Sequence, residues 1–241
     1  MTDPVSVSEA AGILGLSPAR VRVLAAHGRL PAAKIGGHWL IDRAVVEARR
    51  RRKGAGGRPF SPRNAWALLA LASGRDVEGI DPSVRSRLRR ALALEGLDEL
   101  GPRLARRAEA RPFVAHLGEI PHLLEDPGLI RSGISAAGEH GLDLVAGQEA
   151  DGYLCAGKLR KFVAAHALSP VGSAGNVTLR LVPDESWSFL VGEPIAPLAA
   201  VALDLTEDPD PRLARVGCEA LRDLDGRHRR DRRTGRQPIQ A

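Results

Sequence analysis

The chain has 241 residues, a length that is sufficient for two compact domains with buried cores. Its composition, with 44% hydrophobic and 27% charged residues, excludes wholesale disorder. No apolar run reaches the roughly 18 residues of a membrane span, so we expect a cytoplasmic protein without membrane contact. The two isolated cysteines, Cys155 and Cys218, exclude a disulfide framework, and we expect both thiols to be buried and reduced. The net charge is +6, but the positive charge lies at the two ends, with +7 over residues 1–60 and +4 over residues 222–241, and the middle is mildly acidic. A polyanion would therefore be attracted to the ends of the chain and not to its whole surface.

Two short helices are expected near the N-terminus. The first is capped by Ser6 or Ser8 and stopped by Gly15. The second starts at Ser17-Pro18, a favoured cap followed by a favoured first helical residue, and ends at Gly28. Helical spacing places the following side chains in a core: Ala10, Ala11, Ile13, Leu14, Val21, Leu24 and Ala25. Two short helices joined by a glycine-containing turn are typical of a helix-turn-helix, whose second helix enters the major groove of DNA.

The outward side of the second helix is the expected DNA-reading surface. With its apolar stripe inward, this helix presents Ser17, Ala19, Arg20 and Arg22 on its outer side or at its N-terminal end. Arginine can bind guanine or phosphate, and Ser17 with the free N–H groups of the first turn can hold a phosphate. The alternative is that both arginines only solvate an exposed face. The pattern around them favours DNA contact.

A β-hairpin is expected after the second helix. Short apolar segments flank Gly36-Gly37, a pair that forms tight two-residue turns. Lys34 and His38 then lie near the tip, where they can touch the DNA backbone or minor groove as a wing. Asp42 caps a third helix that ends in the basic run at residues 49–52, which suits both the helix dipole and phosphates.

Five pieces of this region, in their order and spacing, resemble the winged helix-turn-helix of the MerR and excisionase superfamily. The pieces are Ser8-Glu9-Ala10-Ala11, Leu14-Gly15-Leu16-Ser17, Val21-Arg22, Gly28-Arg29-Leu30-Pro31-Ala32 and residues 36–42. The resemblance implies specific binding of double-stranded DNA through the second helix and the wing, usually with two modules, and therefore a homo-oligomer. No sustained heptad repeat follows, so the coiled coil and the metal or drug sensing of MerR regulators proper are not implied. The expected DNA-binding residues are Ser17, Ala19, Arg20, Arg22, Arg29, Lys34, Gly36, Gly37, His38, Arg49 and Arg50.

The whole chain is expected to have an α+β fold, with an N-terminal winged helix-turn-helix, a helical segment and a mixed α/β C-terminal domain. The predicted boundaries are 1–53 for the DNA-binding domain, 54–60 for a linker, 61–112 for the helical segment, 113–226 for an α+β partner-binding or oligomerisation domain, and 227–241 for a basic disordered tail.

Helices are predicted to start at Ser61-Pro62 and Asp81-Pro82 and to cover residues 97–110, 158–166 and 210–224. Strands are predicted at residues 152–155, 177–182, 187–191 and 199–205, the second and third forming a hairpin. The arginine-rich face of residues 81–94 has three open interpretations: it solvates the helix, pairs with nearby acidic residues, or lies on DNA.

A second resemblance rests on short strings of the C-terminal part. Arg131-Ser132-Gly133-Ile134, Gly175-Asn176-Val177-Thr178 and Ala202-Leu203-Asp204-Leu205 resemble actinobacterial helix-turn-helix proteins, some similar to antitoxins of abortive-infection type IV pairs. That likeness implies a protein partner, a nucleotidyltransferase-like toxin, and repression of the protein's own operon.

No enzymatic site is expected. The densest acidic cluster, at residues 204–210, is interpreted as a turn and helix cap at Asp208 and Asp210, although its carboxylates could be imagined as a metal site. The histidines lack paired metal spacing, and no glycine-rich phosphate loop is present, so neither a metal nor a cofactor is expected.

The sequence therefore predicts a DNA-binding transcriptional regulator, most simply a repressor. Two alternatives keep the same N-terminal module: an antitoxin that neutralises a toxin through the C-terminal domain, and an excisionase-like architectural factor that bends DNA.

Overall fold

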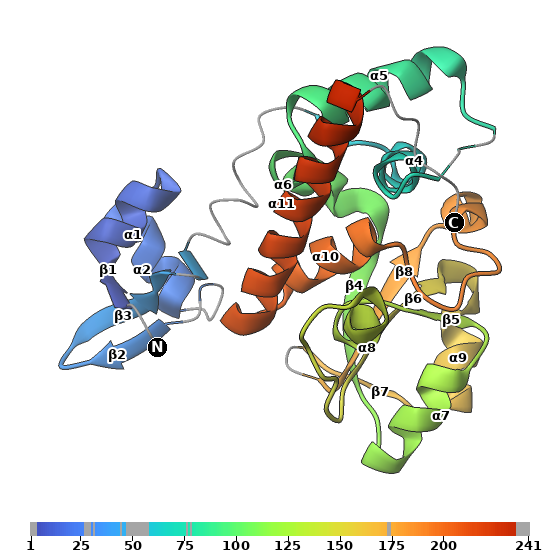
Figure 1. Ribbon diagram of the computed structural model, residues 1–241. Helices are drawn as coiled ribbons and strands as arrows, with labels where there is room; N and C mark the ends of the chain where they lie inside the picture. Colours follow the sequence, from blue (N-terminus) through green and yellow to red (C-terminus); the bar gives the residue numbers. More distant parts are fainter. Residues whose placement is uncertain are drawn as a thin grey trace.

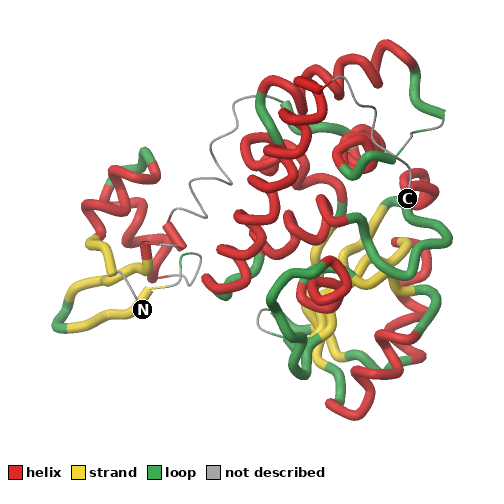
Figure 2. The backbone as a smooth tube through the Cα atoms, viewed as in Figure 1, coloured by secondary structure: helices red, strands yellow, loops and turns green. Residues whose placement is uncertain are grey.

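The computed structural model describes residues 4–26, 30, 32–43, 45–46, 58–75, 77, 79–172 and 175–234, and in the last helix it describes side chains up to residue 227. The chain combines helices with two separate sheets, as expected for an α+β protein (Figures 1 and 2). Among the described helices, none is both long and apolar enough to span a membrane.

The N-terminal module combines two helices with a three-stranded antiparallel sheet. Its elements are β1 (Pro4–Ser6), α1 (Val7–Leu14), α2 (Pro18–Ala26), β2 (Ala32–Ile35) and β3 (His38–Asp42). Strand β3 lies between β1 and β2. Both helices and the β2–β3 hairpin agree with the sequence prediction. Strand β1 is missing from that prediction, because three residues are too few to show an alternating pattern.

One hydrophobic core holds this module together. Val5 of β1, Val21 of α2 and Ile41 of β3 are completely buried in it, and Val46 belongs to the same cluster. Residues 43, 45 and 46 are helical, where the third helix is expected. The rest of that predicted helix, with Arg49 and Arg50, lies outside the described residues.

The C-terminal part begins with α4 (Pro62–Ala72), α5 (Pro82–Leu94), α6 (Leu97–Leu100) and the 3-10 turn η1 (Gly101–Arg107). Both predicted helix starts are confirmed, and each is capped by a side chain. The side chain of Ser61 accepts a hydrogen bond from the Asn64 N–H at 3.3 Å, and that of Asp81 accepts one from the Ser83 N–H at 2.8 Å.

The prediction of one helix over residues 97–110 is wrong at its end. Glu109 and Ala110 belong to strand β4, where they are paired with Leu181 and Arg180. A cross-strand partner about 70 residues away overrides the helical pattern of this segment, because strand pairing depends on tertiary context more than on local propensity.

A five-stranded mixed sheet lies in the C-terminal part. Its strands are β4 (Glu109–Val114), β5 (Leu129–Arg131), β6 (Ala150–Cys155), β7 (Ser169–Pro170) and β8 (Val177–Val182). In the order β5-β6-β8-β4-β7, the β6–β8 pair is parallel and the other three pairs are antiparallel. The strands predicted at residues 152–155 and 177–182 are confirmed.

Helices and short 3-10 turns surround this sheet. The helices are α7 (Ile120–Glu125), α8 (Ile134–Ala137), α9 (Leu159–Ala165), α10 (Leu198–Glu207) and α11 (Pro211–Thr234), and the turns are η2 (Leu117–Glu119), η3 (Gly138–His140), η4 (Ala156–Lys158) and η5 (Asp184–Phe189). The helix predicted over residues 158–166 corresponds to α9.

Three predictions in this region are corrected. Residues 199–205 form helix α10 instead of a strand, since a continuous apolar run fits a buried helix as well as a buried strand, and its alanines favour the helix. Residues 187–189 belong to the turn η5, so β8 has no hairpin partner there. The last helix does not stop at Leu224 but continues to Thr234, through the first residues of the predicted disordered tail.

The two faces of the sheet pack against different helices (Figure 1). Leu154 and Leu179 belong to a core with residues of α7 and α9. Tyr153, next to Leu154 on β6, belongs to a larger core with residues of α4, α10 and α11, because neighbouring strand residues point to opposite faces. This larger core contains both Trp66 and Leu203, so the predicted segments 61–112 and 113–226 share one core.

A buried ion-pair network connects α10 to the sheet. Its centre is Asp204, which is completely buried. Its Oδ1 atom accepts hydrogen bonds from Arg107 Nη2 at 2.6 Å and from the Tyr153 hydroxyl at 2.8 Å. Its Oδ2 atom accepts a hydrogen bond from the Ser132 hydroxyl. Arg180 Nη1 lies 3.1 Å from Oδ1, so a single carboxylate joins η1, β6, β8 and α10.

Two further carboxylates complete the network. Asp151 accepts Nε and Nη2 of Arg180 at 2.8 Å each, and Glu207 accepts Arg107 Nη1 at 2.9 Å and Arg180 Nη1 at 3.0 Å. Burial disfavours the charged guanidinium groups, but the adjacent carboxylates outweigh burial and hold the pKa of both arginines well above the usual value. Burial, followed by the charge of Asp204, raises the pKa of Tyr153 well above its usual value, so the phenol remains a donor.

The acidic cluster at residues 204–210 therefore divides into two roles. Asp204 and Glu207 bind arginines, whereas Asp208 and Asp210 accept backbone N–H groups of Asp210 and Arg212 at 2.7 and 2.8 Å, in keeping with the predicted turn and cap. Within the described ranges, no group of three or more potential metal-binding side chains occurs. Both cysteines are free and buried, as predicted.

We predict that Asp204→Ala strongly destabilises the C-terminal part. The substitution removes one of the two carboxylates that Arg107 and Arg180 share, and the more deeply buried one. Breaking a buried ion pair typically costs about 3 kcal/mol or more in the free energy of unfolding. Urea unfolding followed by circular dichroism measures the loss. The control is Glu219→Ala, which removes an exposed partner of Arg215 on α11 and should cost about 0.5 kcal/mol or less. Equal effects of the two substitutions would contradict the role given to Asp204.

Candidate nucleic-acid interface

Helix α1 is fixed at both ends by local interactions. The Ser6 hydroxyl accepts the Glu9 N–H at 3.2 Å, and the Glu9 carboxylate accepts the Ser6 N–H at 2.9 Å, which is a capping box. The backbone hydrogen bond from Ser6, followed by that of its side chain, lowers the pKa of Glu9. Of the two predicted caps, Ser6 is therefore the one used. Gly15 ends the helix with a left-handed φ of 59°, a conformation that glycine adopts without strain.

The turn between the helices positions the start of α2. The Leu16 N–H donates to the Ala11 carbonyl at 3.0 Å, closing the turn behind Gly15. The Ser17 hydroxyl accepts the Arg20 N–H at 3.3 Å, and Pro18 is the first helical residue, as predicted. Ser17 thus caps α2 and remains exposed at the N-terminal end of this helix.

Burial of one side of α2 determines which side chains it exposes. Val21, Leu24 and Ala25 are buried, and the predicted contact residues Ala19, Arg20 and Arg22 are exposed. At 100° per residue, Ala19 and Val23 lie opposite the buried stripe, with Arg20 on one flank and Arg22 on the other. Val23 is 45% exposed, so the outer face of α2 has an apolar centre between two guanidinium groups.

The β2–β3 hairpin is a second exposed feature. Gly36 and Gly37 have φ angles of 58° and 83°, which match the two central residues of a type I′ turn. Lys34, Gly36, Gly37 and His38 are exposed, as predicted. The Lys34 ammonium lies 5.9 Å from the centre of the Trp39 ring. Trp39 itself is half-buried and packs against the module's core, so it anchors the hairpin.

The segment from the end of α1 to the hairpin is basic. Residues 10–41 include Arg20, Arg22, Arg29 and Lys34 but no aspartate or glutamate. Arg29, like Arg49 and Arg50, lies outside the described residues, so their predicted roles in DNA binding stay predictions. The structure adds two exposed apolar residues that the sequence prediction missed, Val23 and Ile35. Helical spacing alone could have identified Val23, because it lies four residues after Ala19.

Comparison with known families supports this description of the module. Residues 5–54 match the model of a family described as a helix-turn-helix domain. Neither the search of curated proteins nor that of solved structures gave a significant match. The N-terminal part of the chain is a helix-turn-helix module, and this domain implies DNA as a binding partner.

We predict opposite effects of two glycine substitutions in this module. Gly37→Ala places a side chain at a φ of 83° and should lower the module's free energy of unfolding by about 1 kcal/mol. Gly12→Ala lies within α1, where a Cβ meets no atom within 4 Å, and should raise it by roughly 0.5–1 kcal/mol. Hydrogen exchange of the α2 amides in the full chain measures both changes. Destabilisation by Gly12→Ala, or none by Gly37→Ala, would contradict the backbone geometry.

Proposed function

We propose that the protein is a sequence-specific DNA-binding transcriptional regulator that acts as a repressor. Helix α2 enters the major groove, and the β2–β3 hairpin contacts the adjacent backbone or minor groove as a wing. The observation that carries the proposal is the exposed face of α2, on which Arg20 and Arg22 flank an apolar centre. Guanidinium groups suit guanine or phosphate, and a valine or alanine methyl group suits the methyl group of thymine.

The proposal includes self-association. A single module presents a nine-residue α2 and the described cations Arg20, Arg22 and Lys34, which can contact only a short stretch of duplex. Helix-turn-helix proteins commonly reach useful affinity by placing two modules on half-sites one helical turn apart. The C-terminal part is the element that we propose to hold the copies together, and no catalytic reaction is assigned to it.

Repression is the simplest regulatory outcome, since a bound oligomer needs only to occlude a promoter. Selection of bound genomic fragments by the full-length protein identifies the sites. A reporter driven by an enriched promoter should be expressed less when the protein is present. Higher expression would contradict repression without contradicting DNA binding.

The same selection separates the two alternatives. Enrichment of a promoter beside a gene for a nucleotidyltransferase-like toxin favours the antitoxin, and neutralisation of that toxin would establish it. Pronounced bending across several adjacent sites favours an excisionase-like architectural factor. Sites upstream of other genes, bound without strong bending, favour the regulator that we propose.

We predict that Arg20→Ala or Arg22→Ala weakens binding to an enriched site by about 1–3 kcal/mol if the arginine reads a base. An arginine that contacts only phosphate instead gives a weaker, sequence-independent loss and a smaller salt dependence. Fluorescence anisotropy at two salt concentrations measures both quantities. The matched control is Arg160→Ala, which removes an exposed arginine from α9 and should leave specific affinity unchanged. Unchanged affinity in both α2 variants would refute the assignment of α2 as the reading helix.

A further inference from the structure

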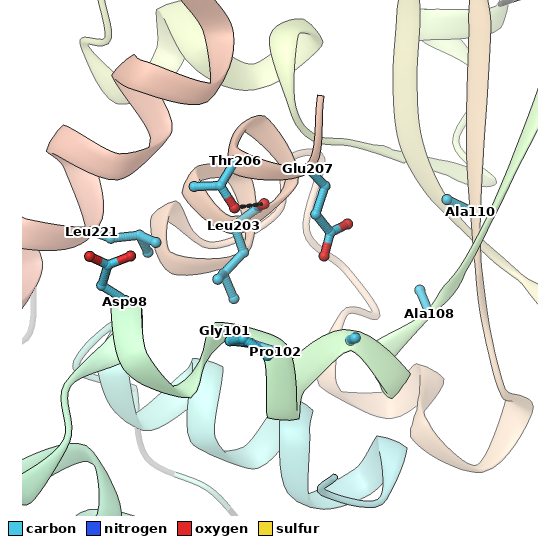
Figure 3. A pocket seen from close by; sticks show the side chains of 10 residues that line it. Asp98, Gly101, Pro102, Ala108, Ala110, Leu203, Thr206, Glu207 and Leu221 are labelled. Carbon is cyan, nitrogen blue, oxygen red and sulfur yellow. Dashed lines mark hydrogen bonds between the residues drawn. The ribbon is translucent and has the colours of Figure 1, made fainter. Parts of the chain in front are cut away.

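A cavity of about 400 Å³ lies between η1 and α10 in the C-terminal part (Figure 3). Its walls come from α6, η1, β4, α10 and α11. The lining residues are Asp98, Gly101, Pro102, Ala105, Ala108, Ala110, Leu203, Thr206, Glu207 and Leu221. Its volume falls within the range of cavities that hold small organic molecules, roughly 300–1,000 Å³.

The lining is mostly apolar and made of small side chains. Leu203 and Leu221 are buried, and the segment from Gly101 to Ala110 contributes only alanine, glycine and proline to the wall. The Thr206 hydroxyl already donates to the Leu203 carbonyl at 2.7 Å, so its proton is engaged within α10. An apolar body therefore fits this space better than a strongly hydrated one.

The charged groups of the cavity are both acidic. Figure 3 shows the carboxylates of Asp98 and Glu207 on opposite sides, with Leu203 between them. No lysine or arginine is among the ten lining residues. Because an apolar side chain separates the two carboxylates, they do not form a shared coordination site for a small metal ion. Their arrangement suits an organic cation whose charge meets one carboxylate while its apolar body covers Leu203.

Glu207 also links the cavity to the buried ion-pair network. Its two oxygens accept Nη1 of Arg107 at 2.9 Å and Nη1 of Arg180 at 3.0 Å, which fixes the carboxylate at the cavity wall. The network pairs two guanidinium groups with the three carboxylates of Asp151, Asp204 and Glu207, so Glu207 is already engaged within it. Asp98 lies at the other side of the cavity, outside this network.

We propose that this cavity is a binding site for a small apolar molecule with a protonated amine. The ammonium group lies against Asp98, because both oxygens of Glu207 already accept arginine N–H groups. The apolar part packs on Leu203, Leu221 and the alanine-rich wall of η1. This site lies in the C-terminal part and does not depend on the function proposed for the N-terminal module.

Isothermal titration calorimetry on the full-length protein tests which ligand charge the cavity prefers, with the apolar body of the ligand held nearly constant. The probes are three indoles with similar bodies: tryptamine, which is a cation, tryptophol, which is neutral, and indole-3-propionate, which is an anion. The proposal expects tryptamine to bind more tightly than tryptophol, and indole-3-propionate to bind most weakly. Equal affinity of the three probes, or no detectable binding of tryptamine at millimolar concentration, would overturn it.

Two variants locate the binding. Asp98→Asn should weaken tryptamine binding by about fivefold, as expected for loss of one partly exposed ion pair, and should leave tryptophol unaffected. The control Glu99→Gln removes a neighbouring exposed carboxylate of α6 that does not line the cavity, and it should change neither affinity.

Ala110→Phe, at an exposed strand position on the wall, should abolish binding of both probes by filling the space. Tryptamine binding that survives Ala110→Phe, in a variant with an unchanged circular dichroism spectrum, would place the ligand elsewhere.

Discussion

The inward packing of Val21, Leu24 and Ala25 is the constraint on which the N-terminal module depends. These side chains fix the rotation of α2 about its axis, and so they decide that Ala19, Val23 and the two arginines face outward. The Ser6–Glu9 capping box and the left-handed Gly15 hold α1 and the turn in register with that packing. The proposed DNA-binding surface thus follows from core packing and cap chemistry.

The C-terminal part relies on a different kind of interaction. Asp204 joins helix α10 to η1 and to strands β6 and β8 through a completely buried carboxylate. Ion pairs at such depth gain little net energy but lose much when one partner is removed, so a packing of the helices that separated the partners would be strongly destabilised. The same arrangement fixes Glu207 at the wall of the adjacent cavity. The position of one of the cavity's two acidic groups is therefore set by the scaffold.

Local signals were sufficient for much of this fold. Helices start at Ser61 and Asp81 as predicted, because a helix cap involves only the next three residues. The Gly36-Gly37 turn is equally local. The prediction of a strand at residues 199–205 is wrong because a segment buried on all sides shows no periodicity that distinguishes a strand from a helix. The network was beyond prediction, since Arg107 and Asp204 are 97 residues apart. Its only trace is a charged residue within an apolar run, as in Leu203-Asp204-Leu205. For the candidate DNA-binding site, the helical period predicts the exposed arginines, but the sequence prediction does not include their apolar neighbour Val23.

The central claim is that α2 touches DNA, and photo-crosslinking tests it most directly. Benzoylphenylalanine is introduced at Ala19 on the outer face of α2 or, as a matched surface position, at Arg160 on α9. The full-length protein is then irradiated with a DNA fragment that it has selected from genomic DNA. The account predicts a covalent protein–DNA product for position 19 and none for position 160. Crosslinking from position 160 with none from position 19, while the modified proteins still bind the fragment, would contradict it.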